Sequence, residues 1–370
     1  MKKIKVMTVF GTRPESIKLA PLIKELRTRQ EIETIVCVTA QHRQMLDQVL
    51  NAFNIVPDYD LDIMKPGQTL TEITARVLAG LEEVIKQVTP DLVLVHGDTT
   101  TAFAGALASY YQRVAIGHVE AGLRTYNKYS PYPEEMNRQL IGTLADIHFA
   151  PTELSRQNLL AEGKRDESIL VTGNTAIDAL KTTVREGYPL ELLDWVEDSR
   201  LIVLTAHRRE NLGEPMYRMF SAIKRIVEKY SDIKVVYPVH LNPLVVKAAN
   251  DVFGDCDRVR LVEPMDVVDF HNLLNRSYII LTDSGGIQEE APSLGKPVIV
   301  LRDTTERPEG IEAGTLKLAG TDEQVIFNMI DELLNNSQEY EKMSKAKNPY
   351  GDGFATKRIA DAIIERFIKT

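Results

Sequence analysis

YIILTDSGGIQEEAPSLGKPVIVLRDTTERPEG, residues 278–310, carries the clearest pattern of secondary structure in this chain. The segment opens with a short β-rich apolar run, 278–282, and a second apolar run follows at 297–301. Between these runs lie a Ser-Gly-Gly turn and a short helix predicted over 287–294, which Gly295 ends. Strand, turn, helix and strand in this order predict one unit of a parallel sheet.

The turn in this segment has the chemistry of a phosphate site. Gly285 and Gly286 lack a Cβ, so a ligand can approach the backbone closely. The N–H groups of residues 284–287, at the positive end of a helix, suit an anion. Glu289 and Glu290 add carboxylates, and a carboxylate beside a phosphate site can accept hydrogen bonds from ribose hydroxyls. A tight strand–helix connection with solvated glutamates explains the same residues equally well, because Gly-rich turns alone are weak signals.

Composition sets the class of protein. A chain of 370 residues suggests two domains with ample core. Its 44% hydrophobic and 26% charged residues are ordinary for a soluble globular protein. The formal net charge of −9 argues against a general binder of nucleic acid or anionic membranes, whereas a nucleotide ligand needs only local cations.

The sequence also predicts a cytoplasmic location. The first apolar run, of about seven residues, is too short for the hydrophobic region of a signal peptide. No apolar run approaches the roughly 20 residues of a membrane-spanning helix. Cys37 and Cys256 have no partner at a diagnostic spacing, so we expect two reduced thiols.

Three predicted strands of the first half are each followed closely by a charged side chain. The pairs are 4–10 with Arg13, 92–96 with Asp98, and 114–119 with Glu120. Because the carboxyl ends of parallel strands meet at one sheet edge, we expect these side chains to converge where α/β proteins bind ligands. Local explanations compete with this one: Arg13 pairing with Glu15, Asp98 capping a helix, and Glu120 pairing with Arg124.

A third carboxylate of the first half, Glu134, follows Pro133, which suits the first position of a helix. Glu134 is therefore either a further functional group or a carboxylate that compensates the helix dipole together with Glu135.

The second half repeats the strand–helix pattern with basic residues at the strand ends. His207 and Arg208 follow the strand 201–205, and His240 follows the strand 234–238. Arginine clusters at such positions commonly bind phosphates. The first half thus contributes carboxylates and the second contributes phosphate-binding groups.

We therefore predict an α/β protein of two Rossmann-like domains facing a central cleft. Periodicity weakens over 184–199, and we place the domains at 1–170 and 171–353, with a C-terminal helix at 354–370 that could pack back on the first domain. Neither half carries GxGxxG after its first strand, so a dinucleotide cofactor is not expected.

Six motifs in the same order resemble a known family over essentially the whole chain. They are GTRPE at 11–15, GDT at 97–99, EAGLRT at 120–125, PEE at 133–135, HRREN at 207–211 and DSGGIQEEAP at 283–292. Together they resemble the non-hydrolysing UDP-N-acetylglucosamine 2-epimerases of bacteria and archaea. The resemblance implies the glycosyltransferase-B-like fold and reversible interconversion of UDP-GlcNAc and UDP-ManNAc without NAD or metal. In this family the reaction proceeds by anti elimination of UDP to 2-acetamidoglucal and re-addition.

The resemblance also implies roles for individual residues. Asp98, Glu120 and Glu134 resemble the acid/base carboxylates, without a decision on which donates and which abstracts. His207 resembles the group that protonates or neutralises the leaving UDP. The UDP-binding positions implied are Arg13, His240, Ser284, Gly285, Gly286 and Glu290, the last on the ribose.

Some bacterial members bind UDP-GlcNAc at a second, activating site, and the segment Gln41-His42-Arg43-Gln44 resembles part of it. Gln41 and Gln44 would contact the activator, and Arg208 and His240 would lie between the two sites. We associate that site with a basic residue directly before Gln-Thr-Leu, and this chain has Gly67 at that position.

The family expectation is a homodimer that supplies ManNAc units for a cell-surface polysaccharide. A hydrolysing epimerase, a glycosyltransferase of the same fold and a non-catalytic UDP-sugar sensor are the alternatives.

Overall fold

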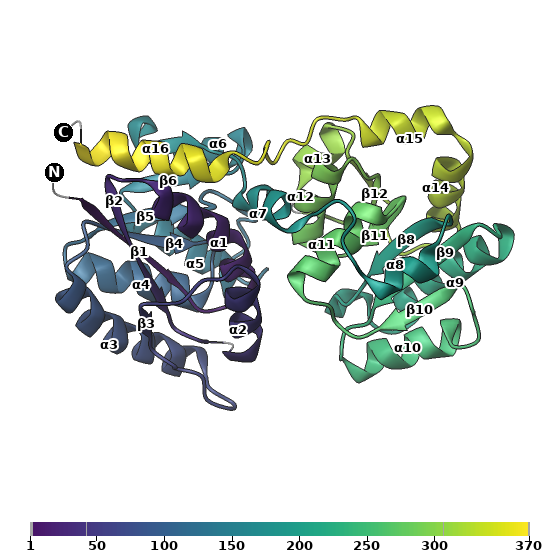
Figure 1. Cartoon of the computed structure of the whole chain (residues 1–370), viewed down its shortest axis with the longest axis horizontal. Coiled ribbons are helices and arrows are strands. Elements are labelled where there is room, and N and C mark those ends of the chain that lie inside the picture. The colour runs from purple at the N-terminus through teal and green to yellow at the C-terminus, as the bar shows by residue number, and fades with distance from the viewer. Residues whose placement is uncertain (1–2, 42, 306, 369–370) are drawn as a thin grey trace. The chain divides into compact units, whose positions relative to one another are not determined.

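Two separate parallel sheets organise the chain (Figure 1). The computed structural model describes residues 3–41, 43–305 and 307–368. One unit comprises Met1–Thr182 with Tyr350–Thr370, and the other comprises Thr183–Pro349. Helices alternate with the strands in both units, so the prediction of two Rossmann-like α/β halves is confirmed.

The sheet of the first unit has the order β3-β2-β1-β4-β5-β6-β7. Its strands are β1 (Ile4–Phe10), β2 (Ile32–Val38), β3 (Tyr59–Asp60), β4 (Leu92–His96), β5 (Ala115–Val119), β6 (Ile147–Ala150) and β7 (Ile169–Val171). Its helices are α1 (Arg13–Thr28), α2 (Arg43–Ala52), α3 (Leu70–Val88), α4 (Thr100–Tyr111), α5 (Glu134–Leu144), α6 (Glu153–Ala161), the 3-10 helix η1 (Asp166–Ser168), α7 (Thr175–Thr183) and α16 (Ala355–Ile368).

The sheet of the second unit has the order β10-β9-β8-β11-β12-β13. Its strands are β8 (Arg200–Thr205), β9 (Ile233–Pro238), β10 (Val259–Val262), β11 (Ile279–Thr282), β12 (Val298–Val300) and β13 (Leu316–Leu318). Its helices are α8 (Glu191–Val196), η2 (Arg209–Asn211), α9 (Glu214–Lys229), α10 (Pro243–Phe253), α11 (Val267–Arg276), α12 (Gly285–Glu290), η3 (Ala291–Leu294), α13 (Pro308–Glu312), α14 (Glu323–Asn335) and α15 (Ser337–Ser344).

The central strands are apolar runs because helices cover both faces of a parallel sheet. Every residue of β4 and β11 is buried, as is all of β1 except Lys5. In each sheet the strand order reverses once, between β1 and β4 in the first and between β8 and β11 in the second. Loops at such a reversal leave a crevice at the carboxyl ends of the strands, where open α/β sheets bind ligands.

The first unit extends beyond the predicted boundary at 170. Strand β7 pairs with β6 and completes the first sheet, so the division falls after Thr182. The chain returns to this unit at Tyr350, rather than at 354, and helix α16 packs on α1 (Figure 1). The side chain of Asp178 in α7 accepts hydrogen bonds from the backbone N–H groups of Ala355 and Thr356 at the start of α16, at 3.2 and 3.0 Å.

Helix α12 begins two residues earlier than predicted, at Gly285. Ser284 occupies the N-cap position in an extended conformation, so both glycines lie inside the first helical turn. The low helix propensity of glycine hides such a start in the sequence. Gly295, with φ of 66°, follows η3 in the left-handed conformation and ends the helical segment as expected.

Candidate active site

The first candidate site lies at the strand reversal of the first sheet. Arg13 begins α1 directly after β1, and Asp98 lies in the turn after β4. Glu120 follows β5, the next strand along. The sheet topology therefore places the three residues at one edge, as the strand-end argument requires.

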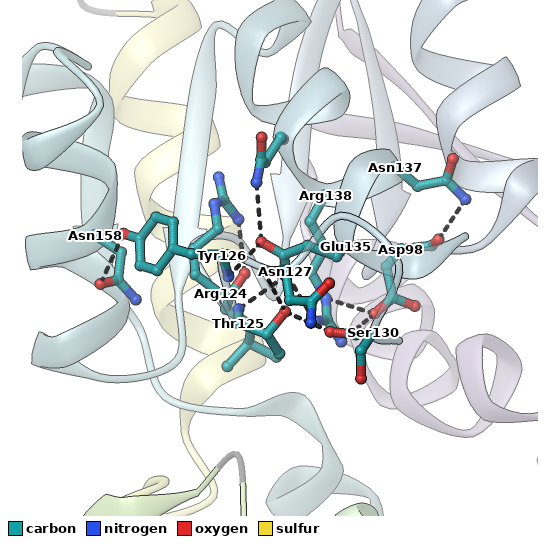
Figure 2. Close-up of polar contacts among 12 residues, drawn as sticks. Asp98, Arg124, Thr125, Tyr126, Asn127, Ser130, Glu135, Asn137, Arg138 and Asn158 are labelled. Carbon is teal, nitrogen blue, oxygen red and sulfur yellow. Dashed lines mark hydrogen bonds and ion pairs between the residues drawn. The ribbon is translucent and has the colours of Figure 1, made fainter. Parts of the chain in front are cut away.

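Asp98 is held by an arginine (Figure 2). The Nε and a terminal nitrogen of Arg138 both lie 2.7 Å from Asp98 Oδ2. The side chain of Asn137 donates to the backbone carbonyl of Asp98 at 2.8 Å. Helix α4 is instead capped by Thr99, whose hydroxyl accepts from the N–H of Ala102. The carboxylate of Asp98 is thus not used as a helix cap.

Glu120 occupies a strained backbone position with basic and polar groups around its carboxylate. Its φ is 64°, which costs energy in a residue with a Cβ and is concentrated at functional sites. Lys18 of α1 forms an ion pair with Oε2, and the amide of Asn174 donates to the same oxygen at 3.1 Å. The Nε2 atom of His96 lies 3.7 Å from it.

Arg124, the local partner considered for Glu120, pairs with another glutamate. Arg124 forms two hydrogen bonds with Glu162, at 2.6 and 2.8 Å. The local salt bridge considered for Glu120 is therefore replaced by contacts to residues distant in sequence.

The two glutamates at the start of α5 have different surroundings. Glu135 is fully buried and accepts from the backbone N–H groups of Thr125 and Tyr126 at 3.0 and 3.1 Å, which fixes the preceding loop (Figure 2). These hydrogen bonds keep its pKa below the ordinary value despite burial. Glu134 is only partly buried, and Pro133 is the N-cap of α5 rather than its first residue.

Glu15 is a structural carboxyl that the sequence did not reveal. It is fully buried and accepts from the N–H and hydroxyl of Thr12 at 2.8 and 2.7 Å and from the N–H of Gly11 at 3.1 Å. The hydroxyl of Thr99 donates to its other oxygen at 2.7 Å. Glu15 thus joins the loops after β1 and β4, and burial raises its pKa to about 7.

Three histidines fill the sheet behind these carboxylates. His96, His118 and His148 are buried on β4, β5 and β6, and burial lowers the pKa of each, to about 4 for His96 and His148 and about 3 for His118. They are therefore neutral at physiological pH. Within residues 3–41, 43–305 and 307–368, no cluster of three or more His, Cys, Asp or Glu side chains is arranged to hold a metal ion.

The second candidate site lies at the strand reversal of the second sheet. Asp283 follows β11 with a carboxylate that is completely buried. Its Oδ2 accepts from the backbone N–H groups of His207 and Arg208, each at 2.8 Å, and from the amide of Asn211 at 3.2 Å. One buried acid thus fixes the loop that carries the predicted phosphate-binding residues.

His207 and His240 stack at this edge. Their ring centroids are 5.3 Å apart and their planes differ by 10°. The side chain of His207 remains 40% exposed, and its Nδ1 lies 3.6 Å from Oδ1 of Asp283. Burial lowers the pKa of His207, while the charge of Asp283 raises it.

The Ser-Gly-Gly segment lies beside the same loop in sheet order. Gly285 leaves space for Arg307, because a Cβ built on Gly285 would lie 2.7 Å from the guanidinium. Arg307 donates to Glu289 at 2.8 Å. Gly286 is partly exposed, and a Cβ there would meet a single neighbouring atom, Oε1 of Glu290 at 3.9 Å. Open backbone is thus available at Gly286, whereas Gly285 accommodates an arginine.

Glu290 is almost buried and lies next to a histidine. Its Oε2 is 3.5 Å from Nε2 of His271, whose Nδ1 is hydrogen-bonded to the hydroxyl of Thr183 at 2.7 Å. The carboxylate of Glu290 is therefore oriented by a side chain of α11.

The segment predicted to contact an activator belongs to the first unit. Gln41 accepts from the hydroxyl of Thr101 at 2.9 Å, and Gln44 is exposed on α2. Arg43 forms ion pairs with Asp47 and Asp60, each at 2.6 Å. His42 lies outside the described residues. Arg208 and His240, assigned to the same function, belong to the second unit.

Several residues that contribute to these two sites were not identified from the sequence as site residues. They are Lys18, Arg138, Asn174, His271, Asp283 and Arg307. Asp283 offered the clearest signal, since it directly precedes the Ser-Gly-Gly segment. The partners of Asp98 and Glu120 offered little, because Arg138 and Lys18 lie far from them along the chain.

Comparison with known proteins places this arrangement in a family. The sequence model of UDP-N-acetylglucosamine 2-epimerase matches residues 24–364. The UDP-N-acetylglucosamine 2-epimerase of Bacillus subtilis is 65% identical over 98% of this chain and 96% of its own length. The structure of the Neisseria meningitidis enzyme bound to UDP-GlcNAc has a TM-score of 0.90 and 50% identity, covering 98% of this chain and 100% of that one. That of Staphylococcus aureus MnaA with UDP has a TM-score of 0.92 and 55% identity, covering 100% and 98%.

Proposed function

Because this chain belongs to the UDP-N-acetylglucosamine 2-epimerase family, we propose that it interconverts UDP-GlcNAc and UDP-ManNAc reversibly at C2. One observation of the structure carries the proposal. Asp98 and Glu120 lie at the same ligand-binding edge of the first sheet, each held by a cation from another element.

The chemistry requires carboxylates in this position. The C2 proton of the sugar has no adjacent carbonyl, so direct deprotonation is difficult. When the anomeric C–O bond breaks, its electron pair leaves with UDP, and C1 becomes cationic and acidifies the C2 proton. A carboxylate removes that proton, and the C2–H electron pair forms the C1–C2 double bond of 2-acetamidoglucal. Re-addition of UDP at C1, with proton delivery to the other face of C2, completes the epimerisation.

We assign the proton transfers to the first unit. Asp98, Glu120 and Glu134 are the acid/base candidates, and Lys18 and Arg138 hold two of them in place. The steps need only proton transfer and departure of the nucleotide, so we propose that neither NAD nor a metal takes part.

We assign UDP to the second unit, with Arg13 of the first as an additional cation. His207 would neutralise or protonate the departing diphosphate, and cations at such a site stabilise the charge that develops there. His240 and the segment Ser284, Gly285 and Gly286 would contact the nucleotide. Glu290 would accept from the ribose hydroxyls in an orientation set by His271.

The test is proton NMR of the purified protein with UDP-GlcNAc alone in D2O. We expect UDP-ManNAc carrying deuterium at C2, with most UDP still attached to sugar. Free ManNAc with released UDP would identify a hydrolysing epimerase. An unchanged sugar with saturable binding would leave a glycosyltransferase that lacks its acceptor, or a sensor.

Regulation by a second UDP-GlcNAc is a separate part of the proposal. Gln41 and Gln44 are its assigned contacts, and Arg208 and His240 are assigned to the region between the activator and the substrate. The charge of Arg43 is balanced by nearby aspartates, so this segment would bind through its amides rather than through net charge. Sigmoidal kinetics with UDP-ManNAc that become hyperbolic when UDP-GlcNAc is added would support activation, and hyperbolic kinetics without it would contradict the assignment.

We further propose a cytoplasmic homodimer that supplies ManNAc units to a cell-surface polysaccharide. Both cysteines are free, as thiols are in a reducing compartment, and two-fold dimers are the commonest symmetric oligomers. No helix in the described part of the chain has the length and apolar character needed to cross a bilayer. Sedimentation analysis tests the dimer, cell fractionation tests the location, and loss of ManNAc from surface polymers after gene deletion tests the product's use.

A further inference from the structure

We propose that Asp283 is a positioning residue for His207, and that its Oδ1 receives the Nδ1–H of the histidine during the reaction. The inference rests on the proposed function, in which His207 assists the departure of UDP. Nδ1 is then committed to the protein, and Nε2 is the nitrogen left to act on the ligand.

The geometry singles out one oxygen. The carboxylate of Asp283 is completely buried, and its Oδ2 is fixed by three donors. Its Oδ1 makes no hydrogen bond within the described part of the chain. Nδ1 of the His207 side chain lies 3.6 Å from this Oδ1 atom.

An unsatisfied carboxylate oxygen in the interior is costly, and a native protein that retains one usually has a functional reason. The three donors on Oδ2 and the burial around it prevent Asp283 from turning toward another partner. The side chain of His207 is 40% exposed and is free to rotate by a small amount. The two atoms lie slightly beyond hydrogen-bond distance, and a small rotation of the ring would bring Nδ1 within reach of Oδ1.

A carboxylate on one ring nitrogen decides which tautomer a histidine adopts and stabilises its cation. Here Asp283 would hold the proton on Nδ1 of neutral His207. When Nε2 takes up a proton, the buried negative charge would stabilise the imidazolium. The same residue thus orients the ring and keeps a proton available for the diphosphate.

The charges around His207 determine in which direction its pKa changes when Asp283 is replaced. The groups that face it are Asp283, the stacked ring of His240 and the guanidinium of Arg208. Burial, His240 and Arg208 lower the pKa of His207, and only Asp283 raises it. In Asp283→Asn the raising contribution is lost, so the pKa of His207 falls further and less of the imidazolium is present at neutral pH.

The experiment compares the wild type with Asp283→Asn in turnover, UDP binding and NMR titration of His207. We expect kcat to fall by about 10²- to 10⁴-fold, the range typical of losing an orienting carboxylate or an acid–base group. The basic limb of the kcat profile should move to lower pH, together with the His207 pKa measured by NMR, while UDP affinity changes by no more than a few fold. An unshifted His207 pKa would overturn the proposal.

Two controls separate positioning from loss of structure. Tyr237→Phe removes a buried hydrogen bond to the carbonyl of Ala206 in the same loop, at 2.5 Å, and leaves the three hydrogen bonds to Oδ2 of Asp283 in place. It should lower stability without moving the pH profile. In a His207→Asn background, Asp283→Asn should cause no further loss of kcat, whereas multiplying losses would mean that Asp283 does not act through His207.

A measurement on the wild type keeps the proposal testable if Asp283→Asn does not fold. Nitrogen-15 NMR at high pH should find the proton of neutral His207 on Nδ1, and a proton on Nε2 would overturn the assignment. Failure of the proposed function is recognised separately, because wild-type protein would then bind UDP without converting UDP-GlcNAc, whatever the tautomer.

Discussion

The strand reversals of the two sheets are topologically alike and chemically opposite. In the first sheet, two carboxylates lie at the carboxyl ends of the strands and cations hold them, as Arg138 holds Asp98 and Lys18 holds Glu120. In the second, the carboxylate is hidden and the basic residues face outward. Asp283 is completely buried and binds the loop through backbone N–H groups, leaving His207 and Arg208 at the edge.

The difference shows how one architecture provides two kinds of site. The position comes from the order of parallel strands, whereas the chemistry comes from a few loop residues and their partners. In the first unit ion pairs hold the carboxylates, whereas in the second unit a buried carboxylate holds the loop through backbone N–H groups. Proton transfer and nucleotide binding should therefore separate along the same division, and substitutions in each unit can test whether they do.

The largest effect is expected from the carboxylates of the first unit. Asp98→Asn and Glu120→Gln should each lower kcat by at least about 10²-fold, because each removes a candidate acid or base. UDP affinity, measured by calorimetry, should remain close to that of the wild type. Glu153→Gln, which removes a surface carboxylate paired with Arg156, is the matched control and should leave kcat unchanged. Near-normal turnover would remove the mutated residue from the chemistry.

Arg13→Ala should weaken UDP binding by about 10- to 100-fold, with a smaller effect on kcat. The expectation follows from losing a hydrogen bond to a charged group, which contributes about 1.5–3 kcal/mol. Arg27→Ala on the same helix is the control, since its guanidinium donates to the backbone carbonyl of Val56, an exposed residue, at 3.3 Å. If the calorimetric UDP affinity of Arg13→Ala were unchanged, Arg13 would have no part in nucleotide binding. The assigned UDP contacts would then all belong to the second unit.

Arg138→Lys should have a moderate effect, on the order of tenfold in kcat. Lysine keeps the positive charge but cannot reproduce the paired hydrogen bonds of the guanidinium to Asp98. UDP affinity should not change, because the partners of Arg138, Asp98 and Glu135, are carboxylates of the first unit. A change in affinity rather than in kcat would show that Arg138 serves the nucleotide.

The smallest effect is expected in stability. Burial raises the pKa of Glu15 to about 7 from 4.5, so the folded state holds a proton that the unfolded state loses. This contribution to stability is present below pH 4.5 and is lost as pH rises through 7. The Tm of the wild type should therefore fall by a few degrees relative to that of Glu15→Gln as the pH rises from about 4.5 to about 7. A difference that is flat with pH would contradict the raised pKa.

The sequence was most informative at positions directly after a predicted strand. The strands before Arg13, Asp98, Glu120 and His207 were predicted, and parallel pairing then placed these side chains at sheet edges. The partners of these residues could not be found in the same way, because Lys18 lies 102 residues from Glu120. Such pairs arise from packing between elements rather than from any local pattern.

Burial was the second feature that sequence reasoning missed. In the sequence Glu15 is a local partner for Arg13 and Glu135 a helix-start carboxylate, and their neighbours along the chain give no sign that both are buried. The boundary after Thr182 was missed for another reason. Strand β7 is only three residues long, and its pairing with β6 is what assigns it to the first sheet.

The return of the chain to the first unit has a consequence for synthesis on the ribosome. The second unit is one uninterrupted segment, Thr183–Pro349, whereas the first is assembled from two separated segments. Helix α16 reaches α1 only after the whole second unit has been translated, and until then Asp178 lacks the N–H groups that it binds. The unit whose synthesis begins first is therefore the last to be completed, and a nascent chain stalled before Tyr350 would carry a first unit without α16 and a second unit whose sequence is already complete.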